Sequence, residues 1–255
     1  MLLATWNVNS LNVRLPHVLD WLASEKPDVL CLQETKQEDS KFPYEALKAA
    51  GYNAIHSGQK TYNGVAILSP HPIEDQHFGI NDYADEQKRV IAATINGVRI
   101  ICAYIPNGQS LDSDKYQYKL GWLKALNGFV ASELKQHPKL ALLGDYNIAP
   151  EDRDVHDPKA WEGQVLVSKP ERYAFQQLIA LGLHDGFRLF EQEEKSFSWW
   201  DYRMAGFRRN LGLRIDHILV SDALKASCQR SWIDKAPRKL ERPSDHTPVV
   251  LELIN

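Results

Sequence analysis

The stretch Leu-Ala-Leu-Leu-Gly-Asp-Tyr-Asn (140–147) joins an apolar run of strand length to a carboxylate and an amide. Side chains two residues apart in extended backbone point the same way, so Asp145 and Asn147 should face one place. A polar or acidic group at the end of an apolar strand recurs along the chain. The other positions of this kind are Asn7 and Asn9, Gln33 and Glu34, Tyr104 and Asn107, Asp216 and His217, and Asp245 and His246. Because strand ends from distant segments gather at one edge of a layered sheet fold, we expect these groups to form a pocket.

The secondary structure predicted from the sequence contains more strands than helices. Short apolar or β-branched runs predict strands over 2–6, 28–32, 64–68, 90–95, 98–104, 140–143, 214–220 and 248–253. Asn96 and Gly97 predict a two-residue hairpin. Helical periodicity predicts helices over 16–24, 43–50, 116–133 and 170–181, with Pro16 in a first turn. This pattern indicates an α/β protein of mixed sheets packed face to face with helices outside, in one domain over 1–255. The strand order stays open.

Composition excludes several classes of protein. The chain has 255 residues, 44% of them hydrophobic and 25% charged, which is typical of a globular protein. With a formal net charge of −3, any nucleic-acid partner must be held by a local basic surface. Three scattered cysteines argue against a disulfide framework, and Cys31 and Cys102 lie in apolar runs as expected for buried strand thiols. No signal peptide or membrane-spanning stretch is visible, so we expect a soluble, cytoplasmic protein without membrane contact.

Taken singly, the polar strand-end residues differ in what they indicate. Asn7 alone is more often a strand-end cap than a ligand, and Glu34 alone could equally be the first solvated residue after a strand. The run Ser-Asp-His-Thr-Pro (244–248) is a stronger signal, because packing seldom requires an adjacent acid and imidazole before a strand. The remaining histidines are interpreted as structural: His17, His56, His71, His77, His137, His156 and His184.

Taken together, the motifs span the chain in a fixed order. They are Trp-Asn-Val-Asn-Ser (6–10), Leu-Gln-Glu-Thr-Lys (32–36), Ser-Gly-Gln-Lys-Thr-Tyr-Asn-Gly-Val-Ala (57–66), Tyr-Ile-Pro-Asn-Gly (104–108), Leu-Gly-Asp-Tyr-Asn-Ile-Ala-Pro (143–150), Trp-Trp-Asp-Tyr-Arg (199–203), Gly-Leu-Arg-Ile-Asp-His-Ile-Leu (212–219) and Glu-Arg-Pro-Ser-Asp-His-Thr-Pro (241–248). In this order the set resembles the exonuclease III family of the endonuclease/exonuclease/phosphatase superfamily. The resemblance implies a four-layer α/β sandwich of two mixed sheets, with the active site at one edge.

Phosphodiester hydrolysis needs an activated water, stabilisation of the charge on phosphorus and help for the leaving oxygen. Mg²⁺ takes oxygen ligands and few protein carboxylates, and Mn²⁺ is an alternative. Glu34 is the best candidate ligand, with Asn7 as its uncharged neighbour, and the resemblance assigns them the same roles. We expect Asp145 to orient and deprotonate the water, Asn147 to donate to a phosphate oxygen, and His246 to bind another. Asp145, Asn147 and His246 are also counted among the predicted metal ligands.

Other roles come from the resemblance alone. It makes Asp216 the partner of His246, Asp245 a metal-side or supporting carboxylate, Tyr104 a phenol at the phosphate or leaving group, and Asn107 a phosphate contact. Asn9 occupies a position where some relatives carry an acid, so its metal role stays open.

Three segments have the mixture of basic and aromatic residues expected of a DNA-binding surface. The first carries Lys60, Tyr62 and Asn63, the second is 115–119, and the third is 199–214 with four arginines, including Arg214. The resemblance puts Trp199 and Ile215 at a pocket for a base-less sugar and Arg203 where the family inserts a side chain into DNA. Trp200 is interpreted as core. We therefore expect a monomer that cuts double-stranded DNA at abasic sites or 3′ ends, without sequence preference.

Two alternatives remain from other functional classes. One is a superfamily phosphatase or lipid phosphodiesterase, which would not need the segment 199–214. The other is a catalytically silent DNA-damage binder, against which the intact set of acids and His246 argues. The balance between endonuclease, exonuclease and 3′-phosphodiesterase, and the number of metals, stay open.

Overall fold

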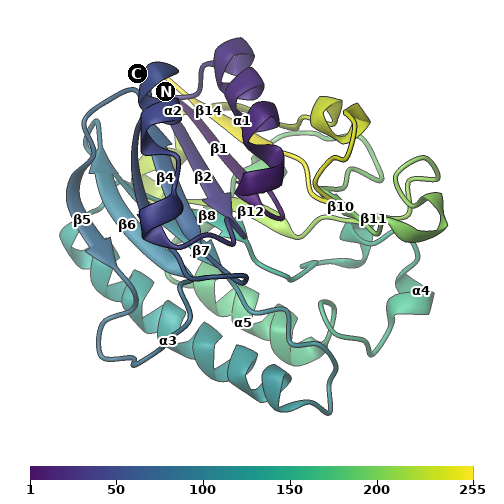
Figure 1. Cartoon of the computed structure of the whole chain (residues 1–255). Helices are drawn as coiled ribbons and strands as arrows, with labels where there is room; N and C mark the ends of the chain where they lie inside the picture. The colour runs from purple at the N-terminus through teal and green to yellow at the C-terminus, as the bar shows by residue number, and fades with distance from the viewer. Residues whose placement is uncertain (255) are drawn as a thin grey trace.

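The computed structural model describes residues 1–254, and within them two six-stranded mixed sheets pack face to face (Figure 1). The first sheet has the order β13-β14-β1-β2-β4-β3. Its strands are β1 (Leu2–Asn7), β2 (Val29–Gln33), β3 (Asn53–Ser57), β4 (Val65–Ser69), β13 (Cys228–Ile233) and β14 (Val249–Leu253). Within residues 1–254, strands β1 and β2 of this sheet pair in parallel, and its other neighbouring strands pair antiparallel.

The second sheet has the order β5-β6-β7-β8-β12-β9. Its strands are β5 (Glu74–Phe78), β6 (Val90–Ile95), β7 (Val98–Tyr104), β8 (Leu140–Asp145), β9 (Leu183–Asp185) and β12 (Asp216–Ser221). Strands β7 and β8 are parallel, whereas β12 runs antiparallel to β8. Asn96 and Gly97 both have positive φ between β6 and β7, which confirms the predicted hairpin.

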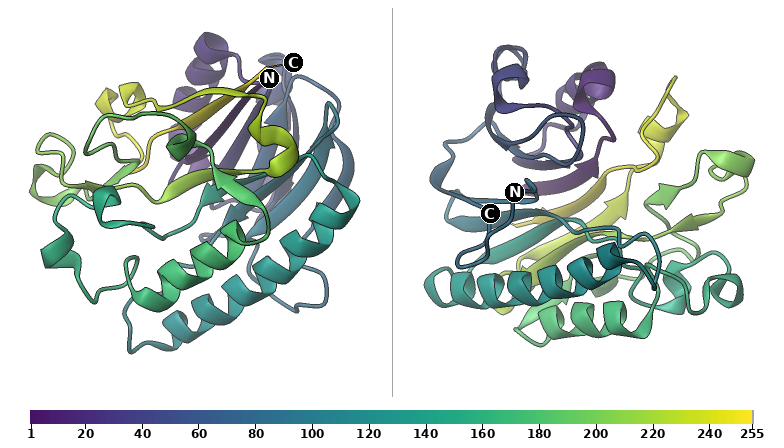
Figure 2. Two further views of the ribbon diagram at one scale, coloured as in Figure 1. Left: turned by 180° about the vertical axis from the view of Figure 1, so that it is seen from behind. Right: turned by 60° about the horizontal axis from the view of Figure 1, so that its bottom comes forward.

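Helices cover the outer face of each sheet, which gives the four layers expected (Figures 1 and 2). Helices α1 (Leu11–Glu25) and α2 (Tyr44–Ala49) lie over the first sheet, and α3 (Asp114–Gln136) and α5 (Lys169–Ile179) lie over the second. The short helices α4 (Pro158–Trp161) and α6 (Asp222–Lys225) and a two-stranded ribbon, β10 (Trp199–Trp200) with β11 (Gly212–Leu213), complete the fold. The predicted α/β class is therefore confirmed.

The apolar core has three main layers, one between the sheets and one beneath each helical layer. Cys31 and Cys102 are buried in the layer between the sheets, as expected of strand thiols. Burial of these apolar faces is the dominant favourable contribution to folding. No helix within residues 1–254 combines the length and hydropathy that a bilayer crossing requires.

The sequence pattern misplaced one helix start. Helix α1 begins at Leu11, so Pro16 lies inside it and the prediction of a first-turn proline is wrong. Because Pro16 has no backbone N–H, the carbonyl of Asn12 one turn earlier lacks its usual donor within the helix. Both residues are exposed, so water can donate to that carbonyl instead. The strands β3, β5 and β13 were not predicted. Strand β5 reads Glu-Asp-Gln-His-Phe, because a largely exposed edge strand lacks the apolar signal.

The topology brings polar strand ends to one edge. The parallel strands β1 and β2 end at Asn7 and Gln33, which are partners in register. Parallel strands β7 and β8 end with Tyr104 opposite Asp145. Strand β12 starts at Asp216, directly opposite Asp145. Strand ends and strand starts thus meet in one place because the sheets combine parallel and antiparallel pairs.

Candidate active site

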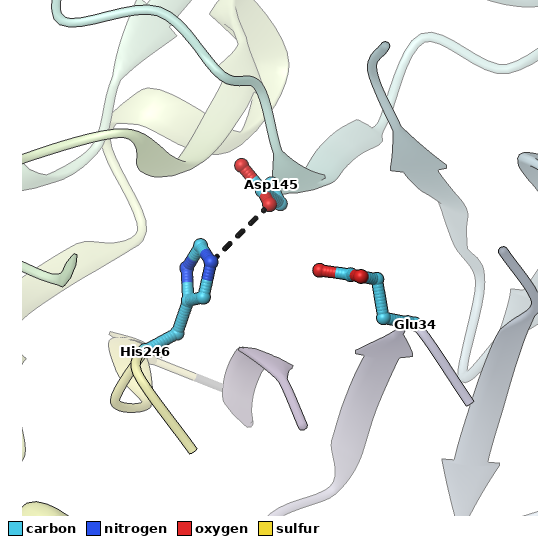
Figure 3. Close-up of side chains that lie close together, drawn as sticks. All are labelled: Glu34, Asp145 and His246. Atoms are coloured by element: carbon cyan, nitrogen blue, oxygen red, sulfur yellow. Dashed lines mark ion pairs between the residues drawn. The ribbon is translucent and has the colours of Figure 1, made fainter. Parts of the chain in front are cut away.

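Glu34, Asp145 and His246 converge although they are far apart in the chain. One ligand atom from each lies within 4.8 Å of the others, and Figure 3 shows the three side chains pointing toward a common space. Glu34 follows β2, Asp145 ends β8 and His246 precedes β14. The three groups therefore converge at one edge, and strands of both sheets position them.

Asn7 links the two carboxylates of this cluster. Its amide nitrogen donates to Glu34 Oε2 at 2.6 Å and to Asp145 Oδ2 at 2.8 Å. Its amide oxygen accepts a hydrogen bond from the backbone N–H of Asn9. In this arrangement Asn7 holds the two carboxylates together.

His246 is held by the acid that the resemblance assigned to it. Its Nδ1 lies 2.9 Å from Asp216 Oδ2, and its Nε2 faces Asp145 Oδ2 at 3.6 Å. Burial alone would lower the pKa of His246, but the charges of Asp216 and Asp145 outweigh burial and raise it to about 10. A protonated ring donates hydrogen bonds from both nitrogens, so this environment favours His246 as a donor to a phosphate oxygen.

Asp145 has the electrostatic character of a base. Burial raises its pKa to about 7, and repulsion from Asp216 and Glu34 acts in the same direction against the attraction of His246. A group that gains and loses a proton near neutrality suits general base catalysis. Its Oδ1 also accepts the backbone N–H of Asn147, which fixes the carboxylate plane.

Two amides lie beside Asp145. Asn147 has a left-handed backbone, with φ of 49°, and its amide nitrogen donates to the carbonyl of Ile105. One amide hydrogen remains for a substrate oxygen. Asn107, an exposed residue on the loop after β7, donates to Asn147 Oδ1 at 3.3 Å. The pair forms a donor surface next to the base.

Tyr104 presents a protonated phenol to the same space. Burial and the charges of Glu34 and Asp145 raise the pKa of its hydroxyl well above the usual range. Arg89 was not among the residues predicted from the sequence. Its guanidinium carbon lies 4.7 Å from the centre of the Tyr104 ring, and its Nη1 donates to the Tyr104 carbonyl. A cavity of about 640 Å³ extends from Tyr104 and Arg89 along Tyr62 and Asn63 to Lys115.

Glu34 is held in a left-handed conformation, with φ of 53°, by its surroundings. The next residue, Thr35, is buried, and its hydroxyl pairs with His56 Nε2 at 2.8 Å. The other ring nitrogen of His56 faces Asp39. A β-carbon on Gly64 would lie 2.0 Å from the Thr35 hydroxyl, so only glycine fits there. His56 thus has the structural role expected of it.

The donor set fits a divalent cation. Two carboxylates and an imidazole converge, and burial together with repulsion from Asp216 and Glu34 disfavours the ionised form of Asp145, a cost that a bound cation would relieve. Glu34 is partly exposed, which leaves one face of the cluster open to water and substrate. Oxygen ligands with room for several waters match the requirements of a hard divalent ion.

The aromatic part of the site lies next to His246. Trp199 forms a β-bridge with His246, and its indole N–H donates to Asp245 Oδ2 at 3.0 Å. The other Asp245 oxygen is buried without a hydrogen-bond partner in the described residues. Ile215 is 1% exposed and packs in an apolar cluster beneath Trp199, and Trp200 is fully buried, as expected of a core residue.

Arg214 does not face the surface, so the expectation that it contacts DNA is wrong. Its side chain is 1% exposed and pairs with Asp154 at 2.7 Å and with Asp185 at 2.7 Å. It also contacts His217, whose other ring nitrogen lies 2.8 Å from the Ile148 carbonyl. Arg214 therefore supports the loop after Asp145 from inside the protein.

The other residues predicted to bind DNA differ in exposure. Tyr62 and Arg203 are exposed, as is Lys60, whereas Asn63 is buried and donates to Gln59. Arg203 pairs with its neighbour Asp201 at 2.6 Å. Exposed surface pairs of this kind contribute little to stability, so Arg203 is available to a partner.

The geometry defines a metal-assisted phosphodiesterase, and comparison with known proteins agrees. The family described as the Endonuclease/Exonuclease/phosphatase family matches residues 4–246. Exodeoxyribonuclease III of Haemophilus influenzae is 37% identical over 97% of this chain and 98% of its own. DNA repair nuclease APEX1 of Danio rerio is 30% identical over 99% of this chain and 82% of its own.

Solved structures show the same relationship. A Neisseria 3′ phosphatase, NExo, bound to a product DNA hairpin has a TM-score of 0.98 and 52% identity, with 99% of each chain covered. An AP endonuclease from Archaeoglobus fulgidus has a TM-score of 0.96 and 39% identity, with 99% of each chain covered. The chain belongs to the Endonuclease/Exonuclease/phosphatase family, and within it the chain is a hydrolytic nuclease of the exodeoxyribonuclease III kind.

Proposed function

We propose that this chain, a DNA repair nuclease, hydrolyses phosphodiester bonds at abasic sites and at 3′ ends of duplex DNA. In this proposal it works as a cytoplasmic monomer with one catalytic domain over residues 1–255, and its ion is Mg²⁺, with Mn²⁺ as a substitute. The observation that carries the proposal is the convergence of Glu34, Asp145 and the His246–Asp216 pair beside Trp199. Relatives named as AP endonucleases, exodeoxyribonucleases and a 3′ phosphatase support the substrate class.

Each residue has a separate task in the hydrolysis. Asp145 takes a proton from the attacking water, since its pKa of about 7 allows it to act as a base near neutrality. The imidazolium of His246 and the free amide hydrogen of Asn147 stabilise charge on the phosphate oxygens. The Tyr104 phenol and Asn107, which lies beside Asn147, also contact the phosphate, and Trp199 over Ile215 forms the apolar wall against the sugar.

Glu34 is the principal residue that would hold the cation, and one carboxylate oxygen of Asp145 lies close enough to contribute a second ligand. When bound, the ion supplies Lewis-acid stabilisation of the phosphate and of the leaving oxygen. Asp245 could support the cation site through its buried Oδ1, which has no hydrogen-bond partner within the described residues.

Glu34→Gln is expected to raise the Mg²⁺ concentration that gives half-maximal activity by at least about tenfold, because a neutral amide ligates a hard cation more weakly than a carboxylate does. The measurement is a magnesium titration of initial rates, with Glu38→Gln as the control on the same loop. Unchanged metal dependence in Glu34→Gln would remove Glu34 from the ligand set.

The substrate is tested with a panel of labelled duplexes carrying an internal abasic site, a 3′-phosphate or a plain recessed 3′ end. We expect magnesium-dependent cleavage of the abasic duplex and release from 3′ ends, both abolished by EDTA. An enzyme that cleaves plain 3′ ends yet leaves the abasic duplex intact would contradict the abasic part of the proposal alone. Activity on small phosphate esters or lipids without any on DNA would instead support the phosphatase alternative, which the comparisons do not favour.

A further inference from the structure

Lys119 in α3 belongs to the segment 115–119 that was expected to face DNA, but it is a fully buried lysine next to the site. Its side chain is 0% exposed, which is unusual for lysine. The ammonium group donates to the Asn107 carbonyl at 3.0 Å, to the Asn147 carbonyl at 2.7 Å and to Glu171. A lysine has three N–H donors, so all of them are engaged.

The two carbonyls belong to the two amide residues of the site. Asn107 follows β7 and Asn147 follows β8, and their side chains contact each other at 3.3 Å. The ammonium group therefore joins two loops that are otherwise separate in sequence, directly behind the side chains that face the substrate. Packing is tight here, because a β-carbon on Gly108 would lie 3.1 Å from the Lys119 stem.

Glu171 balances the charge and extends the network. It is fully buried and accepts the backbone N–H groups of Leu166 and Ser168 and the Ser168 hydroxyl. Breaking a buried pair by removing one partner is costly, whereas removing both charges is often tolerated. An apolar side chain at 119 would leave two loop carbonyls without this donor.

We propose that Lys119 is a positioning residue for phosphodiester hydrolysis, which holds the peptide groups of Asn107 and Asn147 so that both amides face the scissile phosphate. This inference rests on the proposed function, since it assigns these amides to the phosphate. Small displacements of groups that contact the reacting centre reduce the rate strongly, by up to about 100-fold for 1 Å.

The test removes the ammonium group without leaving a buried charge unpaired. In Lys119→Met with Glu171→Gln, we expect kcat on a recessed duplex with Mg²⁺ to fall about 10- to 100-fold while KM changes less than about threefold. Glu171→Gln alone is the matched control for loss of the ion pair, because it keeps the Lys119 bonds to both carbonyls. Lys124→Met, an exposed lysine on the same helix, should have the wild-type kcat.

A double-mutant cycle with Asn147→Ala identifies the route of the effect. If Lys119 acts through Asn147, the Lys119→Met/Glu171→Gln pair should lower kcat less than about threefold in the Asn147→Ala background. Thermal unfolding of every variant confirms that each is folded at the assay temperature. Should the paired variant be unfolded, Lys119→Arg keeps the charge while its planar fork changes the donor directions, and it should also lower kcat.

Wild-type kcat in the folded variants, an equal loss in Glu171→Gln alone, or a full additive loss with Asn147→Ala would overturn the inference. These outcomes are read against active wild-type enzyme. If wild type cleaves no duplex at all, the proposed function fails first, and the same cycle is then measured on the phosphodiester that wild type does cleave.

Discussion

Asp145→Asn is expected to lower kcat by about 10³- to 10⁴-fold while duplex DNA still binds with near wild-type affinity. The asparagine has the size of the aspartate but cannot accept the proton of the attacking water. The exposed residues predicted to bind DNA, such as Tyr62 and Arg203, should be unaffected because they lie outside the carboxylate cluster. Single-turnover cleavage and fluorescence-anisotropy binding with the same labelled duplex measure the two quantities separately.

His246→Asn should produce a loss of similar size, because the imidazolium between Asp216 and Asp145 is lost. The two changes together should cost little more than either alone, since both residues act on the same attacking step. Full additivity would show that they act independently.

The stability of Asp145→Asn provides an internal control. The raised pKa of Asp145 means that its ionised form is less favourable in the folded protein than in the unfolded chain. Such a group reduces stability progressively above the unfolded pKa of 3.8, and the full cost is present above about pH 7. In EDTA at pH 8, Asp145→Asn should therefore have a Tm at or above that of wild type. A lower Tm would mean that lost activity reflects unfolding.

Arg214→Met is expected to lower the free energy of unfolding by about 3–5 kcal/mol, a large part of the stability of a typical domain. The change removes the one guanidinium that pairs with Asp185 among the described residues and leaves Asp154 with Arg188 as its remaining cationic partner. Burial raises the pKa of each carboxyl, but the charge of Arg214 opposes this effect, and the pKa of each lies below its ordinary value. Urea unfolding at pH 7 measures the loss.

Arg203→Met is the matched control from the same segment. Its guanidinium is exposed and its pair with Asp201 lies at the surface, so stability should change by less than about 0.5 kcal/mol. DNA affinity should instead fall. The reverse result, with intact stability and weaker DNA binding in Arg214→Met, would restore the interpretation of Arg214 as a DNA contact.

The sequence by itself determined the strands that position the site and the chemistry at their ends. Runs such as 140–143 and 248–253 are largely apolar because the strands are buried, and the polar residues directly beside them, after 140–143 and before 248–253, mark the sheet edge. Asp145, His246 and Glu34 were accessible to this reasoning because each lies directly beside such a run. Local sequence carries this information, since alternation and burial act over a few residues.

Only the tertiary structure separated residues of the same type within one segment. Arg203 and Arg214 are indistinguishable in sequence, but one is exposed and the other pairs with carboxylates from positions 154 and 185. Lys119 was expected at a DNA-binding surface within 115–119, whereas folding buries it and places Asn107, Asn147 and Glu171 around it. The role of a charged side chain depends on whether it loses water and which opposite charge it meets. Partners from distant segments decide both, so short-range sequence patterns cannot specify them.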